Sequence, residues 1–378
     1  MQINPFILGN RIPEKYFCDR EEESMMLVRS IMNQENVVLV SPRRVGKTGL
    51  MNHCFNMPEV FNNHIVMYVD ILHTTTLKEF IQEIGNAVFR NVARRNDRMM
   101  KMFAATVRSL QASFGYDPVN NVPTFDIKLG HIAQPEYSLD EIFEYIEKAE
   151  KRCVIAIDEF QQIVNYPEKN IEAILRGRIQ RLSNVNFIYS GSERRLMTEM
   201  FFSDKRPFFQ SATMLHLGVI ELPKYADFAR KHFEEAGKSI EQAAIEYAYQ
   251  RYDGITLYLQ RMMHDAFSMT KEGETFTKEN MKWQSKAYVR QQETRLKEML
   301  SHISEQQKEL LYAICEDGIA ERITSGEFVR RHNLKSASAV QAALKKLLEY
   351  DVVTQNGKQF SISDPLLRIW LRERNSDV

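Results

Sequence analysis

The sequence predicts an α/β protein with a parallel β-sheet, followed by an all-α unit and a C-terminal winged helix-turn-helix unit. Short all-apolar runs alternate with helical segments in the first part of the chain, which is typical of parallel sheets buried on both faces. Beyond this part the pattern is helical, and the last segment adds an Asn-Gly hairpin signal. We therefore predict three domains, at residues 1–221, 222–299 and 300–378.

Five short apolar runs predict the strands of the sheet. They are residues 37–40, 65–70, 154–157, 186–190 and 214–219. Helical segments between them favour right-handed crossovers with helices on both faces of the sheet. Residues 113–138 interrupt the alternation with Gly, Pro and Asn, and a short alternating piece at 124–129 indicates a hairpin within a surface insertion.

The first helix is predicted over residues 19–33, with Asp19 as its N-cap and acidic residues in its first turn. Near the other end of the chain, three helices are predicted at 304–316, 325–332 and 336–350. A hairpin at 352–362, turning at Asn356-Gly357, follows them. Three helices and a β-wing make a winged helix-turn-helix.

Composition narrows the functional classes. Lys+Arg and Asp+Glu are both 50, so net charge gives no reason to expect nucleic acid or an acidic membrane as a partner. The four cysteines are far apart and offer no metal-binding spacing. The sequence has neither a signal-peptide pattern nor an apolar stretch of membrane-spanning length. We expect a cytoplasmic protein.

Residues 41–48, between the first strand and a helix, match the phosphate-binding pattern G-x-x-x-x-G-K-[ST] except at Ser41. Serine can take the place of glycine there if its φ is negative. In such a loop, backbone N–H groups and the positive end of the helix hold phosphate oxygens. Gly46 lets the backbone approach, Lys47 reaches the β- and γ-phosphates, and Thr48 ligates Mg²⁺. The candidate nucleotide-binding residues are Ser41, Pro42, Arg43, Arg44, Val45, Gly46, Lys47, Thr48 and Gly49.

The third strand ends in two carboxylates, Asp158 and Glu159. Because parallel strands end at the same edge of a sheet, this pair is expected beside the phosphate-binding loop. Asp158 would hold the Mg²⁺ shell, through water, and Glu159 would polarise the attacking water. A solvated acidic turn is the alternative interpretation, but the presence of the phosphate-binding loop in the same chain favours a catalytic and metal-binding role.

Three polar residues lie at or after the end of the fourth strand. Ser190 and Ser192 are both placed to contact the γ-phosphate or the attacking water, and the sequence does not choose between them. Arg206 is a candidate arginine finger, either in cis or toward a neighbouring subunit of a homo-oligomer. A solvated loop charge is the other interpretation of Arg206.

Together these motifs resemble the archaeal-type ATPases of the AAA+/STAND group of P-loop proteins. The matching segments are Asn4-Pro5-Phe6, Phe17-Cys18-Asp19-Arg20-Glu21, residues 41–48, Ile157-Asp158-Glu159-Phe160-Gln161, Ser190-Gly191-Ser192 and Asp364-Pro365-Leu366-Leu367-Arg368-Ile369-Trp370. The resemblance implies a P-loop NTPase sheet of strand order 5-1-4-3-2, ATP and Mg²⁺ as cofactors, and Phe17 and Arg20 near the adenine. Relatives carry a Gly-x-Pro in the helical lid, whereas this chain reads Asp253-Gly254-Ile255-Thr256 there.

The sequence thus predicts an ATP-binding protein and ATP hydrolase that acts as a nucleotide-dependent switch on a protein partner. The alternative is a DNA-associated ATPase with helix 336–350 in the major groove. Residues 301–378 hold 11 basic and 11 acidic residues, so the winged helix lacks a basic footprint, which favours the protein partner. A binding-only scaffold is the third hypothesis, and the pair Asp158-Glu159 argues against it.

Overall fold

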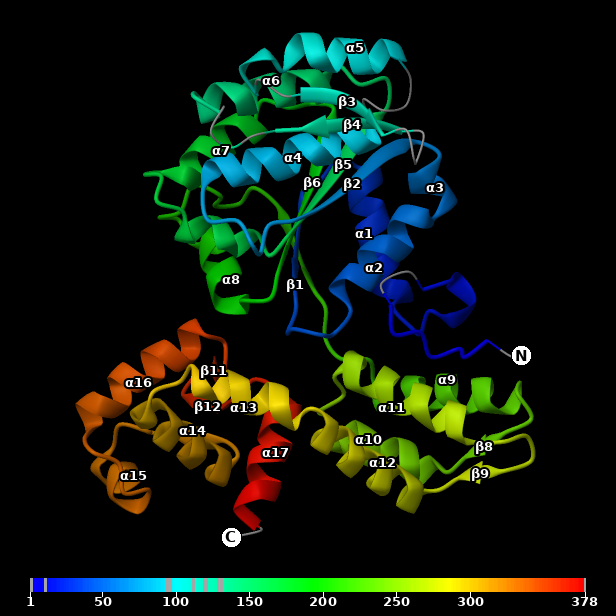
Figure 1. The fold of residues 1–378 in the computed structure, drawn as a ribbon, viewed down its shortest axis with the longest axis vertical. Coiled ribbons are helices and arrows are strands. Elements are labelled where there is room, and N and C mark those ends of the chain that lie inside the picture. The colour runs from blue at the N-terminus through cyan, green and yellow to red at the C-terminus, as the bar shows by residue number, and fades with distance from the viewer. Residues whose placement is uncertain are drawn as a thin grey trace. The chain divides into compact units, whose positions relative to one another are not determined.

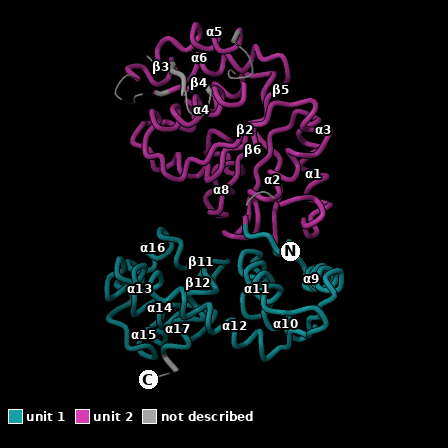
Figure 2. Tube along the Cα trace, turned by 45° about the vertical axis from the view of Figure 1, so that its right-hand side comes forward, with its two compact units in different colours: residues 1–8, 219–378 teal, residues 9–218 magenta. Residues whose placement is uncertain are grey.

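The structure is a computed structural model of the 378-residue chain. It describes residues 3–9, 12–92, 97–110, 113–117, 122–127, 129 and 132–376. The chain forms two compact units (Figure 2). Gly9–Gly218 form one, here called the sheet unit, and Met1–Leu8 with Val219–Val378 form the other, the helical unit. The further division of the helical unit into lid and winged helix at residue 300 stays a prediction.

The sheet unit is built on five parallel strands. They are β1 Val37–Val40, β2 His64–Asp70, β5 Arg152–Asp158, β6 Val185–Gly191 and β7 Thr213–His216. Their order, β2-β5-β6-β1-β7, confirms the predicted 5-1-4-3-2 arrangement. β7 ends three residues earlier than expected. β2 lies at an edge of the sheet and is not buried on both faces, because Tyr68 and Asp70 are exposed at its carboxyl end.

Helices cover both faces of this sheet (Figure 1). They are α1 Glu21–Met32, α2 Lys47–Asn56, α3 Pro58–Phe61, α4 Leu77–Asn91, α5 Asp97–Thr106, α6 Pro135–Glu147, α7 Ile171–Ile179 and α8 Arg194–Phe202, with short 3-10 turns at Glu14–Tyr16, Arg108–Leu110 and Phe160–Asn165. Apolar side chains of α4 and α6 pack with those of β5 and β6 in one continuous core. An antiparallel pair, β3 Ser113–Asp117 with β4 Val122–Asp126, confirms the hairpin expected in the insertion.

The start of α1 differs from the prediction. Its N-cap is Arg20, not Asp19, and no side chain caps it. Both residues have left-handed backbone conformations, with φ of 56° at Asp19 and 78° at Arg20. The Arg20 side chain is buried, donating from Nη2 to the carbonyl oxygen of Gly218 at 2.6 Å and pairing with Glu23 at 2.8 Å. A long-range bond therefore determines this helix start.

The helical unit begins with five helices, α9 Leu222–Glu234, α10 Gln242–Arg251, α11 Thr256–Met269, α12 Lys278–Gln291 and α13 Glu293–Ser301. The expectation of helices alone misses one small feature, the parallel pairing of β8 Ser239–Ile240 with β9 Thr275–Phe276. The N-terminal segment belongs to this unit. Phe6 is fully buried against the rings of Phe228, Phe233 and Phe267, with centroids 5.8–5.9 Å away. Asn4 donates to the carbonyl oxygen of His264 at 2.9 Å.

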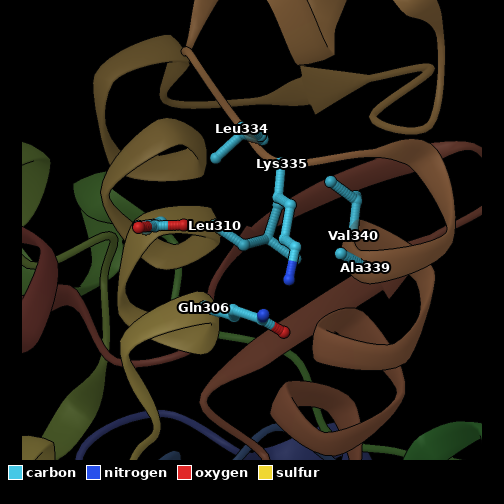
Figure 3. A pocket seen from close by; sticks show the side chains of 7 residues that line it. Gln306, Leu310, Leu334, Lys335, Ala339 and Val340 are labelled. Atoms are coloured by element: carbon cyan, nitrogen blue, oxygen red, sulfur yellow. The ribbon is translucent and has the colours of Figure 1, made fainter.

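The winged helix-turn-helix is present as predicted. It consists of α14 Glu305–Asp317, β10 Ala320–Glu321, α15 Gly326–Arg331, α16 Ala337–Glu349, β11 Val353–Asn356, β12 Gln359–Ile362 and α17 Pro365–Ser376. The wing turns at Gly357, whose φ is 61°. A hollow between α14 and the start of α16, lined in part by Leu310, Lys335 and Val340, has a volume of about 10 Å³ (Figure 3). Such a volume has room for about one water molecule, so it is no ligand pocket.

In the described part of the chain, none of the helices combines the length and the apolar character that crossing a bilayer requires.

Candidate nucleotide-binding site

The loop between β1 and α2 contains two residues with left-handed backbone conformations. Arg44 and Gly46 lie in the left-handed region, with φ of 67° and 109°. Gly46 is the N-cap of α2, and no atom lies within 4 Å of the position that a Cβ would take. That space, at the positive end of a helix, is open to an anion. Ser41 does not have a positive φ, which explains how serine replaces glycine there.

The side chains of residues 41–48 differ in how exposed they are. Val45 and Lys47 are buried, while Pro42 and Arg43 are exposed. Gly49 is half-buried in the first turn of α2, where a Cβ would contact Ile12 at 3.8 Å. The buried side chains anchor the loop in the sheet unit, while the exposed residues leave part of its backbone accessible.

Asp158 is the centre of the site. It ends β5, is 6% exposed, and accepts hydrogen bonds on both carboxylate oxygens. Oδ1 accepts from Ser190 Oγ at 2.6 Å and from the backbone N–H of Glu159 at 3.1 Å. Oδ2 accepts from Tyr68 OH at 2.5 Å and from Thr48 Oγ1 at 3.4 Å. The structure therefore brings together the predicted metal ligands Thr48 and Asp158.

Tyr68 was not predicted as a site residue. It lies on β2, and its hydroxyl reaches across to the end of β5. Burial, together with the charge of Asp158, raises the pKa of Tyr68 above its ordinary value, so the hydroxyl stays a hydrogen-bond donor. The one signal in the sequence is a polar aromatic residue two positions before the end of a strand.

Glu159 is held by a second set of partners. Its Oε2 accepts from Ser192 Oγ at 2.7 Å and from Gln161 Nε2 at 2.5 Å. Ser192 Oγ in turn lies 3.4 Å from Nε of Arg43, in the phosphate-binding loop. The two serines that the sequence could not separate thus have different partners, since Ser190 contacts Asp158 and Ser192 contacts Glu159. Gln161, which is 3% exposed, was missed as a positioning residue.

The remaining candidates lie elsewhere in the sheet unit. Arg206 forms ion pairs with Glu172 at 2.9 Å and Glu199 at 3.9 Å. Burial raises the pKa of Glu172, and Arg206 opposes that shift. An arginine-finger role would require Arg206 to leave these carboxylates, and it stays a prediction.

The segment before α1 reaches the helix that follows the phosphate-binding loop. The Phe17 ring is stacked on the imidazole of His53 in α2, with centroids 3.9 Å apart and an interplanar angle of 7°. Burial lowers the pKa of His53, which favours the neutral imidazole. Arg20 bonds to Gly218, as described above. Contact of Phe17 and Arg20 with adenine stays a prediction.

The chemistry of these groups fits Mg²⁺ bound together with a nucleotide. Hydroxyl and carboxylate oxygens are ligands that Mg²⁺ accepts, and it commonly takes one or two protein ligands beside water and phosphate oxygens. Thr48 and Asp158 supply two such oxygens. Over the ranges that the structure describes, no cluster of three or more His, Cys, Asp or Glu could hold a metal without a nucleotide.

Comparison with protein-family models shows the family to which the chain belongs. A family model described as an ATPase domain predominantly from Archaea matches residues 17–262. The chain belongs to this family. A second model, for a probable winged helix domain, matches residues 294–373. The resemblance that the motifs indicated is therefore confirmed, and the sheet unit of this family member contains the candidate site.

Solved structures show the same fold. A Walker-type ATPase of Pyrococcus abyssi matches with a TM-score of 0.67 and 18% identity, over 97% of this chain and 99% of that one. The ORC2 protein of Aeropyrum pernix, solved as ADPNP-ADP complexes, matches with a TM-score of 0.56 and 14% identity, over 99% of this chain and 98% of that one. The ORC1 protein of A. pernix, solved in complex with DNA, matches with a TM-score of 0.50 and 15% identity, over 97% of this chain and 94% of that one. A search of curated proteins gives no match.

Proposed function

We propose that this archaeal-type ATPase binds ATP with Mg²⁺ at residues 41–48 and hydrolyses it. The observation that supports the proposal is the 3.4 Å contact between Thr48 and Asp158, because two side chains that share a Mg²⁺ ion would have to lie close together. The A. pernix ORC2 protein, whose fold is similar, was solved with ADPNP and ADP.

Each residue then has a chemical role. The backbone of the loop and Lys47 would bind the phosphates, and Thr48 and Asp158 would hold Mg²⁺, which would supply charge neutralisation to the phosphates. Glu159 orients the attacking water and accepts its proton. Ser192 and Gln161 fix the Glu159 carboxylate, and Ser190 fixes that of Asp158.

Phosphate release from ATP-Mg²⁺ tests this assignment. Glu159→Gln should bind a fluorescent ATP analogue as the wild type does, but lose about 10²–10⁴-fold in turnover. Lys47→Ala should lose binding itself. The matched control is Glu144→Gln, which changes an exposed glutamate on α6 that pairs with Lys148. Turnover by Glu159→Gln at the wild-type rate would exclude the assigned base.

We further propose that nucleotide binding switches the protein's action on a protein partner. Residues 301–378 carry equal numbers of basic and acidic residues. Some of the basic side chains form salt bridges, such as Lys346 with Glu349 and Arg331 with Asp317. Balanced charge disfavours binding to a polyanion.

DNA association is the second candidate. It is favoured by the A. pernix ORC1 protein, which has a similar fold and was solved in complex with DNA. A gel shift with random duplex DNA at several salt concentrations separates the two. Affinity that falls steeply with salt and turnover that rises with DNA would support DNA association, since phosphate contacts release counterions. Turnover that ignores DNA supports the protein-directed switch.

A further inference from the structure

Tyr68 occupies an unusual place beside the metal ligands. It pairs in register with Ala156, two residues before Asp158, on the edge strand β2. Its side chain is 36% exposed, yet its hydroxyl lies 2.5 Å from Oδ2 of Asp158, a residue that is 6% exposed. A partly exposed side chain therefore closes one side of a buried carboxylate.

The hydrogen bonds to Asp158 use all of its acceptor positions. A carboxylate has about four lone-pair sites, two on each oxygen. Ser190 and the N–H of Glu159 bond to Oδ1, and Tyr68 and Thr48 bond to Oδ2. The Thr48 contact is the longest of the four, at 3.4 Å, so a metal-bound water that donates to Oδ2 competes mainly with the 2.5 Å bond from Tyr68.

The four donors differ in how readily they can leave. Ser190 is fully buried and the Glu159 donor is backbone, so both are fixed. Thr48 can ligate a metal through an oxygen lone pair and still donate its proton to Asp158. Tyr68 is the one exposed residue among these four, so its side chain can turn toward solvent with the least loss of packing.

We propose that the Tyr68 hydroxyl is a displaceable placeholder for a Mg²⁺-bound water. In the metal-free protein it satisfies Oδ2 of Asp158, and it gives up this bond when the metal arrives with its water shell. The inference rests on the proposed function, in which Asp158 holds that shell. It assigns to Tyr68 the role of a positioning residue that lowers metal affinity and couples metal entry to movement of one side chain.

The test is Mn²⁺ affinity in the presence of ADP, followed by the EPR signal of free Mn²⁺, for the wild type and Tyr68→Phe. Loss of the competing hydroxyl should tighten Mn²⁺ binding roughly three- to tenfold, as expected for one net hydrogen bond. Tyr68→Leu also lacks the hydroxyl and should change affinity in the same direction. The matched control is Tyr145→Phe, which removes a hydroxyl bonded to the carbonyl oxygen of Met99 and should leave affinity unchanged.

The outcomes distinguish failure of the placeholder role from failure of the proposed function. Equal or weaker Mn²⁺ binding by Tyr68→Phe, with binding lost in Asp158→Asn, would overturn the placeholder role and leave the proposed function intact. Failure of the wild type to bind Mn²⁺ with ADP, or unchanged binding by Asp158→Asn, would overturn both. Tighter binding in both Tyr68 variants supports the placeholder.

Discussion

Gly191 ends β6 between the two serines that hold Asp158 and Glu159, and it has no room for a side chain. A Cβ at this position would lie 2.5 Å from Gln161 Oε1, 2.6 Å from Met197 Cγ and 2.7 Å from Met197 Sδ. Separations this short force atoms to move. Gly191→Ala must therefore shift the buried Met197 and the side-chain amide of Gln161, whose Nε2 donates to Glu159.

The two shifts have separate consequences. Overpacking against Met197 should cost the sheet unit about 1–3 kcal/mol of unfolding free energy, which lowers its Tm by roughly 5 °C. Displacement of Gln161 removes one of the hydrogen bonds that orient Glu159. Turnover of ATP should therefore fall, whereas nucleotide affinity, which depends on residues 41–48, should stay close to that of the wild type.

Thermal unfolding and phosphate release measure these effects on the same preparation. The control is Gly177→Ala in α7, where no atom lies within 4 Å of the new Cβ. A helical Gly→Ala change without a clash should stabilise by about 0.5–1 kcal/mol. If Gly191→Ala had the Tm and the turnover of the wild type, the reasoning about Gln161 and Met197 would be refuted.

Two other perturbations test parts of the fold. Phe6→Ala should destabilise the helical unit by roughly 3–5 kcal/mol, seen as faster hydrogen exchange in α9 and α11 than in the control Leu8→Ala, whose side chain is 38% exposed; equal exchange would mean that Phe6 adds nothing. Because burial lowers the pKa of His53 below 6.5, the unfolded chain binds a proton that the folded chain does not, and stability should fall as pH drops below about 6.5. This slope should shrink in His53→Phe, which keeps a ring for Phe17, and an unchanged slope would count against the assignment.

Much of the fold could be predicted because its signals are local. Residues 37–40 are all apolar, as expected of a strand buried on both faces, and the Gly-Lys-Thr beyond them stands where a phosphate-binding pattern is expected, between a strand and a helix. The acidic pair at 158–159 was found for the same reason, since its place at the end of an apolar run determines where it lies in a parallel sheet.

The rest depends on contacts between distant residues. Tyr68 and Asp158 are 90 positions apart, and a polar aromatic residue near the end of a strand does not by itself indicate which carboxylate its hydroxyl reaches. Gln161, in the 3-10 turn Phe160–Asn165, has room beside Glu159 because Gly191 at the end of β6 carries no side chain. The helix start at Arg20 depends on a carbonyl 198 positions away, which overrode the capping preference of Asp19.

The burial of Phe6 in the helical unit has a consequence for biosynthesis. The aromatic rings that enclose it, which include Phe228, Phe233 and Phe267, are translated more than two hundred residues later. At ordinary elongation rates this delay is on the order of tens of seconds. During it, residues 9–218 can complete their own core, while Phe6 remains without these partners. The segment around Phe6 is thus made well before the helices that bury it.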